Sequence, residues 1–194
     1  MIRHISGIIF AVLVVFALIA AYATYVSLRQ DPEQLDNVGK QEEPKMLSYS
    51  NSTYGISFKY PSTYQLAEKE VGDAHRAHYS IVLMRKEDLP PPQNGEGPPA
   101  ISIDIYQNDI DRMELVDWVV GTSYSNFKLG TGTYTSTSVS GVEAVRYNWS
   151  GLYEGETVAF AHQKNIVAAS VTYLDPNNDI RRDFDTLLAS ILLD

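Results

Sequence analysis

The distribution of hydrophobic residues divides the chain into three parts. An uncharged, apolar run covers residues 5–28, and an acidic stretch with two prolines follows it. Farther along, apolar residues recur at regular intervals, which is typical of a folded domain. The pattern predicts a membrane segment over residues 1–29, a flexible linker over residues 30–46 and a single domain over residues 47–194.

The apolar run is long enough to cross a bilayer as a helix, which needs about 20 residues. Arg3 precedes the run, whereas acidic residues soon follow Arg29. The positive-inside bias therefore predicts a single-pass protein of the cell membrane, with a cytoplasmic N-terminus and an extracytoplasmic domain. Ala21-Tyr22-Ala23 also matches a signal-peptidase site, and cleavage after Ala23 would instead release a secreted domain. The length of the run favours the retained anchor.

Short alternating segments predict that much of the domain is β-structure. Ile101, Ile103 and Ile105 alternate with polar residues, as in a strand with one buried face. The run YSIVLM over residues 79–84 is apolar on both faces, as in a central strand. Further strands are predicted over residues 54–58, 145–149, 158–162 and 166–174. The short turn Gln163-Lys164-Asn165 between two of them favours an antiparallel sheet.

Two helices are predicted between the strands. Asp111 and Glu114 have the spacing of a capping box, and Leu115, Trp118 and Val119 then share one helical face. A second helix is predicted to begin between Asp175 and Asp179. Its apolar stripe comprises Ile180, Phe184, Leu187, Leu188, Ile191 and Leu192. Strands interrupted by two helices predict an α+β sandwich with a largely antiparallel sheet flanked by helices.

Composition narrows the choice of partners. The formal net charge is −9, so the surface repels nucleic acid and anionic lipid head groups, and no nucleic-acid partner is predicted. The chain has no cysteine, which excludes disulfides, thiolate metal sites and a lipid-modified cysteine. Any membrane attachment must then come from the peptide itself. The sequence has no glycine-rich phosphate loop, and no cofactor is predicted.

The domain resembles the PsbP-like family. Residues 54–64 (YGISFKYPSTY) are similar to the family's opening motif G-F-S-F-x-Y-P-x-x-W, with Tyr64 at the position where tryptophan is usual. Four further features follow in the family's order, namely a tryptophan-bearing helix over residues 115–119, a strand start over 139–144, a hairpin over 157–174 and a closing helix over 184–192. The resemblance implies an αβα sandwich and a role in binding or assembly rather than catalysis.

Asp73, His75 and His78 are the candidate metal ligands. Two histidines three residues apart can chelate a metal from one helical face, with Asp73 as a third ligand or orienting group. Such a site would make the chain a metal-dependent hydrolase, which is the alternative function. The segment leads into the predicted strand at Tyr79, where residues three apart point to opposite faces. Two exposed histidines in a turn are the structural alternative.

Residues 175–179 (DPNND) place oxygen side chains at three positions of a calcium-binding loop. Ile180 and Thr186 replace the glycine and the glutamate that such a loop requires, so helix capping accounts better for these residues. Tyr106 is predicted to point away from the isoleucine face of its strand, and Tyr134 and Tyr153 lie in polar or turn-like contexts. These three tyrosines form a candidate protein-binding surface, because tyrosine suits partner recognition. Ordinary sheet packing is the alternative.

The sequence therefore predicts a membrane-tethered, extracytoplasmic PsbP-like accessory domain without catalytic activity. Its expected partners are the membrane, through residues 5–28, and a protein or a small ligand at the cell envelope.

Overall fold

The computed structural model describes residues 44–71, 78–93, 96–108 and 112–194. Within residues 44–194 the chain forms one compact unit. The predicted membrane segment and most of the predicted linker lie outside the described residues. In the part that is described, no helix has both the length and the apolar character needed to cross a membrane.

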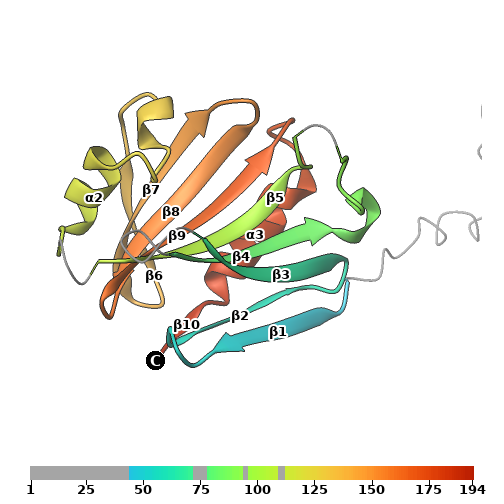
Figure 1. Cartoon of the computed structure of the whole chain (residues 1–194), viewed down its shortest axis with the longest axis horizontal. Coiled ribbons are helices and arrows are strands. Elements are labelled where there is room, and N and C mark those ends of the chain that lie inside the picture. The colour runs from blue at the N-terminus through green and yellow to red at the C-terminus, as the bar shows by residue number, and fades with distance from the viewer. Residues whose placement is uncertain (1–43, 72–77, 94–95, 109–111) are drawn as a thin grey trace, which may run out of the picture. The chain divides into compact units, whose positions relative to one another are not determined.

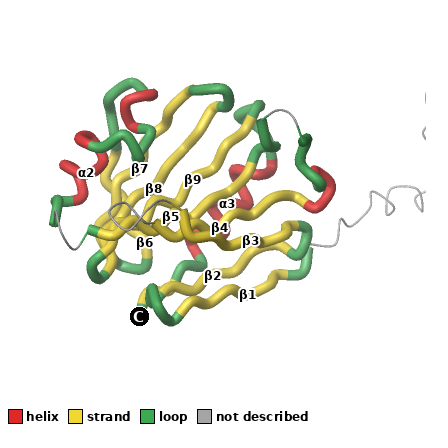
Figure 2. The backbone as a smooth tube through the Cα atoms, in the orientation of Figure 1, coloured by secondary structure: helices red, strands yellow, loops and turns green. Residues whose placement is uncertain are grey.

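The strands form two antiparallel sheets (Figures 1 and 2). The small sheet has the order β1-β2-β10 and consists of β1 (Met46–Asn51), β2 (Ile56–Pro61) and β10 (Leu192–Leu193). The large sheet has the order β3-β4-β5-β9-β8-β7-β6. Its strands are β3 (Tyr64–Val71), β4 (His78–Arg85), β5 (Ala100–Gln107), β6 (Thr135–Val139), β7 (Val142–Ser150), β8 (Glu154–His162) and β9 (Asn165–Tyr173).

Apolar layers cover both faces of the large sheet. On one face, helix α3 (Asp179–Ala189) packs against β9 and against β2 of the small sheet, and in Figure 1 it lies behind the strands. This layer holds the larger cluster of buried residues, which includes Ile103, Phe184 and Phe58. On the other face, helix α2 (Leu115–Gly121) packs against β8, and the 3₁₀ turn η3 (Phe127–Leu129) packs against β7. The predicted sheet with helices on both faces is confirmed.

The predicted strands are also present, but the first begins at Ile56 and not at Tyr54, because Gly55 has a positive φ of 58° and belongs to a turn. Gln163 and Lys164 form the turn of the β8–β9 hairpin. The second helix is capped as predicted, since the Asn178 side chain accepts a hydrogen bond from the Ile180 amide. This helix ends at Ala189, earlier than its apolar stripe, because Leu192 pairs with Ser57 of β2 and continues the chain as a strand.

The predicted capping box of the first helix is wrong. Helix α2 begins at Leu115, and Glu114 is itself the N-cap, without a side-chain hydrogen bond. The cause lies in Asn108, whose side-chain amide donates to the Met113 carbonyl and accepts from the Met113 amide. These two bonds occupy the backbone of Met113, and Arg112 has a positive φ of 47°, so the helix cannot extend back to Asp111.

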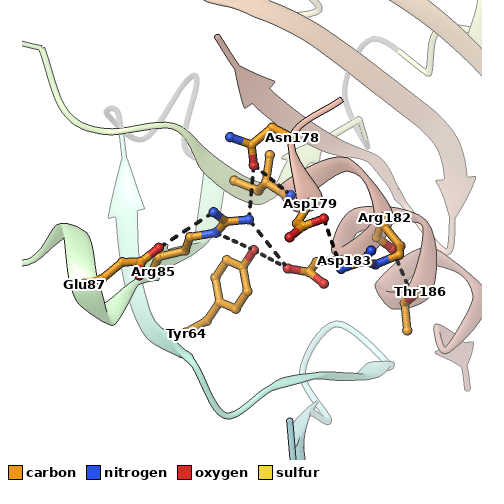
Figure 3. A network of polar contacts seen from close by, with 9 residues as sticks. Tyr64, Arg85, Glu87, Asn178, Asp179, Arg182, Asp183 and Thr186 are labelled. Carbon is orange, nitrogen blue, oxygen red and sulfur yellow. Dashed lines mark hydrogen bonds and ion pairs between the residues drawn. The ribbon is translucent and has the colours of Figure 1, made fainter. Parts of the chain in front are cut away.

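A polar network joins β3 and β4 to the start of α3 (Figure 3). The Tyr64 hydroxyl donates to Asp183 at 2.7 Å, and the Arg85 guanidinium donates to Asn178 at 3.1 Å. Burial raises the pKa of Tyr64, which therefore remains a proton donor over the physiological range. Tryptophan, usual at this position in the PsbP-like motif, has no hydroxyl that could make this bond, so the tyrosine has a specific structural role.

A second network links the two sheets through Glu68 of β3. Tyr49 of β1 and Tyr79 of β4 both donate hydrogen bonds to the same carboxylate oxygen. The bond from Tyr49, followed by the one from Tyr79, lowers the pKa of Glu68 below its ordinary value of 4.5. The ionised carboxylate therefore stabilises the contact between the sheets.

This network predicts a pH-dependent stability. Because the folded-state pKa of Glu68 is lowered, its stabilising contribution is present above pH 4.5 and is lost as the pH falls through the lower, folded value. Glu68→Gln should unfold at lower urea concentration than the wild type at neutral pH, and should lose less stability on acidification. Glu70→Gln, on the same strand, is the control. Identical pH profiles for the wild type and Glu68→Gln would contradict the prediction.

Candidate functional site

The face of the large sheet that carries α2 contains a cavity of about 200 Å³ beside the loop that follows this helix. We call it the Asp104 pocket. Its lining includes Ser102, Asp104, Tyr106, Tyr124, Trp149 and Thr172. The pocket is open in part because α2 and η3 pack against β8 and β7, beyond the centre of the sheet.

The alternation of β5 produces the polar floor of this pocket. Ile101, Ile103 and Ile105 are buried in the core beneath α3. Residues between them therefore point to the opposite face, which places Ser102, Asp104 and Tyr106 in the pocket. The predicted orientation of Tyr106, away from the isoleucine face, is confirmed.

The Asp104 carboxylate is held on both sides. The Ser102 hydroxyl donates to Oδ2 at 2.9 Å, and His78 Nε2 lies 3.5 Å from Oδ1. The ring of His78 stacks on that of Tyr106, its neighbour in the β4–β5 register, with centroids 4.6 Å apart. The side chain of Asp104 is only 18% exposed, so its position is well defined.

Aromatic rings form the walls of the pocket. Tyr106 contacts Trp118 of α2 at 5.0 Å and Tyr124 at 5.7 Å between centroids. The Trp149 indole donates a buried hydrogen bond to Thr157 at 2.9 Å. Burial, and secondly the charge of Asp104, raises the pKa of Tyr106, so its hydroxyl stays protonated. The pocket therefore combines one anionic group with neutral hydroxyls and aromatic surface.

This arrangement does not match a serine hydrolase. In such an enzyme the serine hydroxyl is hydrogen-bonded to a histidine, which is oriented in turn by a carboxylate. Here the Ser102 hydroxyl donates to Asp104. The histidine is therefore not placed between the hydroxyl and the acid.

Of the candidate metal ligands, the structure places His78 at the start of β4, beside Asp104. Asp73 and His75 lie outside the described residues, so the three-residue site stays a prediction. Among the residues that are described, no group of three or more histidine, aspartate or glutamate side chains could hold a metal ion. The pairing of His78 with Asp104 could not be predicted from the sequence, because it depends on the register between β4 and β5.

The residues of the calcium-like loop form the turn before α3, the cap of this helix and an ion pair in its first turn. Asp175 accepts from the Asn177 amide, Asn178 caps α3, and Asp179 pairs with Arg182. The candidate tyrosines occupy three different parts of the fold. Tyr106 is in the pocket, Tyr134 is 41% exposed just before β6, and the Tyr153 hydroxyl donates to the Gly97 carbonyl.

A second feature lies at the edge of the large sheet. A groove of about 470 Å³ separates β6 from the end of α3, and we call it the β6 groove. Thr137, Val139, Leu188 and Leu192 line it, together with the ion pair between Arg146 and Asp185. Arg146 also pairs with the buried Glu156, whose other carboxylate oxygen accepts from Arg181 at 3.0 Å.

Strand β6 is an open edge. It pairs with β7, and no other described strand pairs with its outer side. Residues 131–138 are all exposed and carry no charge. The opposite edge strand β3 carries Glu68, Lys69 and Glu70, which discourage pairing with another chain. The edge strand β1 of the small sheet is uncharged as well, but none of its residues lines the β6 groove.

Comparison with solved structures is decisive for the fold. The solution structure of cyanobacterial PsbP (CyanoP) from Synechocystis sp. PCC 6803 superposes with a TM-score of 0.53. The match covers 80% of this chain and 96% of that chain, at 13% sequence identity. This chain has a PsbP-like fold. The PsbP-like resemblance predicted from the sequence motifs is thereby confirmed for the fold.

A crystal structure from Bacteroides thetaiotaomicron VPI-5482 is also similar, with a TM-score of 0.45 and 10% sequence identity. That match covers 78% of this chain and 49% of the other. No family model and no curated protein matches the sequence.

Proposed function

We propose that this chain is a membrane-tethered, non-catalytic accessory domain that binds a partner protein outside the cytoplasm through β6. The apolar run over residues 5–28 supports the tether. The sequence predicts a flexible linker over residues 30–46, and its expected r.m.s. length of about 20 Å would let the domain reach neighbours of the anchor. The PsbP-like fold supports an accessory role.

The open edge of β6 carries the proposal. Ser140 and Gly141, with φ of 51° and 81°, form the tight turn between β6 and β7, and Val139 pairs with Val142 next to it. In a hairpin with a two-residue turn, the backbones of the two residues that flank the turn are hydrogen-bonded to each other. From there, every second residue of the strand is bonded to the partner strand in this way. The backbone groups of Ser136 and Ser138 therefore point outward, where they can pair with a strand from another chain.

The groove defines what kind of strand fits. Alternate side chains of an added strand would lie on the same face as Thr137 and Val139, and so above the β6 groove. Leu188 and Leu192 offer apolar contacts, and Asp185 lies at the groove with a side chain that is 58% exposed. We therefore expect an extended partner segment with alternating apolar and neutral or basic residues. A second copy of this chain is a less suitable partner for β6, because each chain has a net charge of −9 and the two copies would repel each other.

The tether is tested by extracting membranes of the producing cells with alkaline carbonate. The full chain should stay in the membrane pellet, whereas a variant that lacks residues 5–28 should be soluble. Release of the intact full chain by carbonate would contradict the tether.

The partner site is tested by photo-crosslinking in the same cells. With benzoylphenylalanine at Tyr134, a heterologous adduct of one defined mass is expected. Ser138→Pro should reduce its yield several-fold, because proline removes an outward N–H donor and is tolerated on edge strands. Ser138→Ala keeps the donor and is the control.

Two results would refute the use of β6. One is an undiminished adduct in Ser138→Pro, and the other is an adduct that proves to be a dimer of this chain. A crosslinker at Leu174, which is 70% exposed and lies outside β6, should give no adduct with the same partner.

A further inference from the structure

We infer that the Asp104 pocket binds an organic ammonium cation, independently of the proposed partner site on β6. The charge of the pocket favours a cation. Asp104 is the one charged residue in the described lining of the pocket, and neither lysine nor arginine lines it. An anionic ligand would be repelled by this carboxylate, whereas a cation is attracted to it.

The aromatic surface of the pocket favours an organic ammonium group in particular. Tyr106, Tyr124 and Trp149 line the same cavity as the carboxylate. The π-faces of tyrosine and tryptophan attract ammonium groups, and the methyl or methylene groups next to the nitrogen pack on the rings. Protein sites for quaternary ammonium groups combine aromatic rings in this way.

The carboxylate of the pocket is preorganised for binding. The Ser102 hydroxyl and the His78 ring hold the Asp104 carboxylate in place, and the side chain is largely buried. The hydrogen bond from Ser102 uses one acceptor site, whereas an ionised carboxylate offers about four. A cation that enters the pocket therefore meets an oriented charge that has little conformational freedom to lose.

Other ligand classes fit the pocket less well. Calcium takes six to eight oxygen ligands, several of them from carboxylates, and the described lining supplies a single carboxylate. A cavity of about 200 Å³ has room for a small organic cation. The net charge of −9 adds long-range attraction for any cation. A neutral sugar could bond to the hydroxyls, but it would bring no positive charge to the carboxylate.

Tetramethylammonium chloride is the probe for this inference, titrated into the full chain in detergent micelles. The assigned indole N–H resonance of Trp149 should shift and saturate, with a dissociation constant of the order of 1 mM. Sodium chloride at equal ionic strength should not reproduce the shift. tert-Butyl alcohol, which has a similar shape but no charge, should bind at least about tenfold more weakly.

Two variants with the same change in net charge locate the site. Asp104→Asn should weaken tetramethylammonium binding about tenfold. Asp117→Asn removes an exposed carboxylate from α2 and should leave binding unchanged. Tyr124→Leu should weaken binding several-fold. Tyr124 is 39% exposed, so its replacement leaves the buried core intact. This variant therefore tests the inference even if Asp104→Asn fails to fold.

Any of four results would overturn the inference. They are an absence of saturable shifts, equal affinity in the wild type and the Asp104 or Tyr124 variant, equal binding of tert-butyl alcohol, and tighter binding of methyl glucoside than of tetramethylammonium. The last result would assign the pocket to neutral polyols.

Discussion

Replacing Phe184 with alanine is expected to lower the free energy of unfolding by about 3–5 kcal/mol. Phe184 is 1% exposed and lies at the centre of α3. It belongs to the same buried cluster as Phe58 of the small sheet and Ile103 of the large sheet. Truncation of this ring therefore opens a cavity where the two sheets and the helix meet, and flanking rigid elements can fill it only in part.

Urea denaturation followed by circular dichroism measures this loss. Thr186→Ala, an exposed change on the same helix, is the control and should alter stability by no more than about 0.5 kcal/mol. If Phe184→Ala were as stable as Thr186→Ala, α3 would not join the two sheets. The small sheet would then have to be held by contacts such as those of Glu68.

Gly155→Ala is expected to cost about 3 kcal/mol, although alanine usually suits a strand better than glycine does. Gly155 of β8 lies opposite Trp149 of β7, and a Cβ atom at this position would overlap three atoms of the indole ring. The ring cannot move away cheaply, because its nitrogen is bonded to the buried Thr157. If the methyl group displaced the indole, the protein would lose as much stability as in a tryptophan truncation, about 3–5 kcal/mol. If the surrounding structure partly accommodated the methyl group, the cost would be about 1–3 kcal/mol.

Thermal unfolding and tryptophan fluorescence should report this change together, with a lower melting temperature and an indole emission shifted to the red. Gly97→Ala is the matched control, since a Cβ atom there meets no other atom within 4 Å. Because Trp149 also lines the Asp104 pocket, Gly155→Ala should weaken tetramethylammonium binding as well. A variant with unchanged stability would mean that the indole does not lie across Gly155.

Elements with a strong local pattern were predictable from the sequence. The alternation of Ile101, Ile103 and Ile105 in β5 and the stripe of Ile180, Phe184 and Leu187 in α3 each specify a buried face. Strand β6 was missed, because Thr135–Val139 is polar on both faces except at its last residue. Such a strand forms because of its hairpin turn and its pairing with β7, and neither of these produces a periodic hydrophobic pattern in the sequence.

Helix α2 shows one local signal overridden by another local contact, because Asn108 and Met113 are only five residues apart. Asp111 and Glu114 have capping-box spacing, but Asn108 binds the backbone of Met113 from the end of β5. The helix therefore starts where this contact ends. Helix propensity and capping-box spacing contribute less free energy than two hydrogen bonds to the backbone of one residue.

The candidate site was less predictable from the sequence than the fold, because it brings together residues that are distant in the chain. Asp104 and His78 belong to different strands, and their contact requires the β4–β5 register. The floor of the pocket could have been predicted from the alternation in β5. Its walls could not, since Tyr124 and Trp149 come from distant parts of the sequence.

The sequence by itself determined the antiparallel α+β fold, most of its strands, the capping of α3 and the PsbP-like resemblance. These features depend on periodicity, turn residues and capping groups, all of which act between neighbours in the chain. The tertiary structure alone decided which polar groups share a pocket and which strand remains open at the edge of the sheet. Both follow from strand order and register, which arise when the whole core packs and which no local segment encodes.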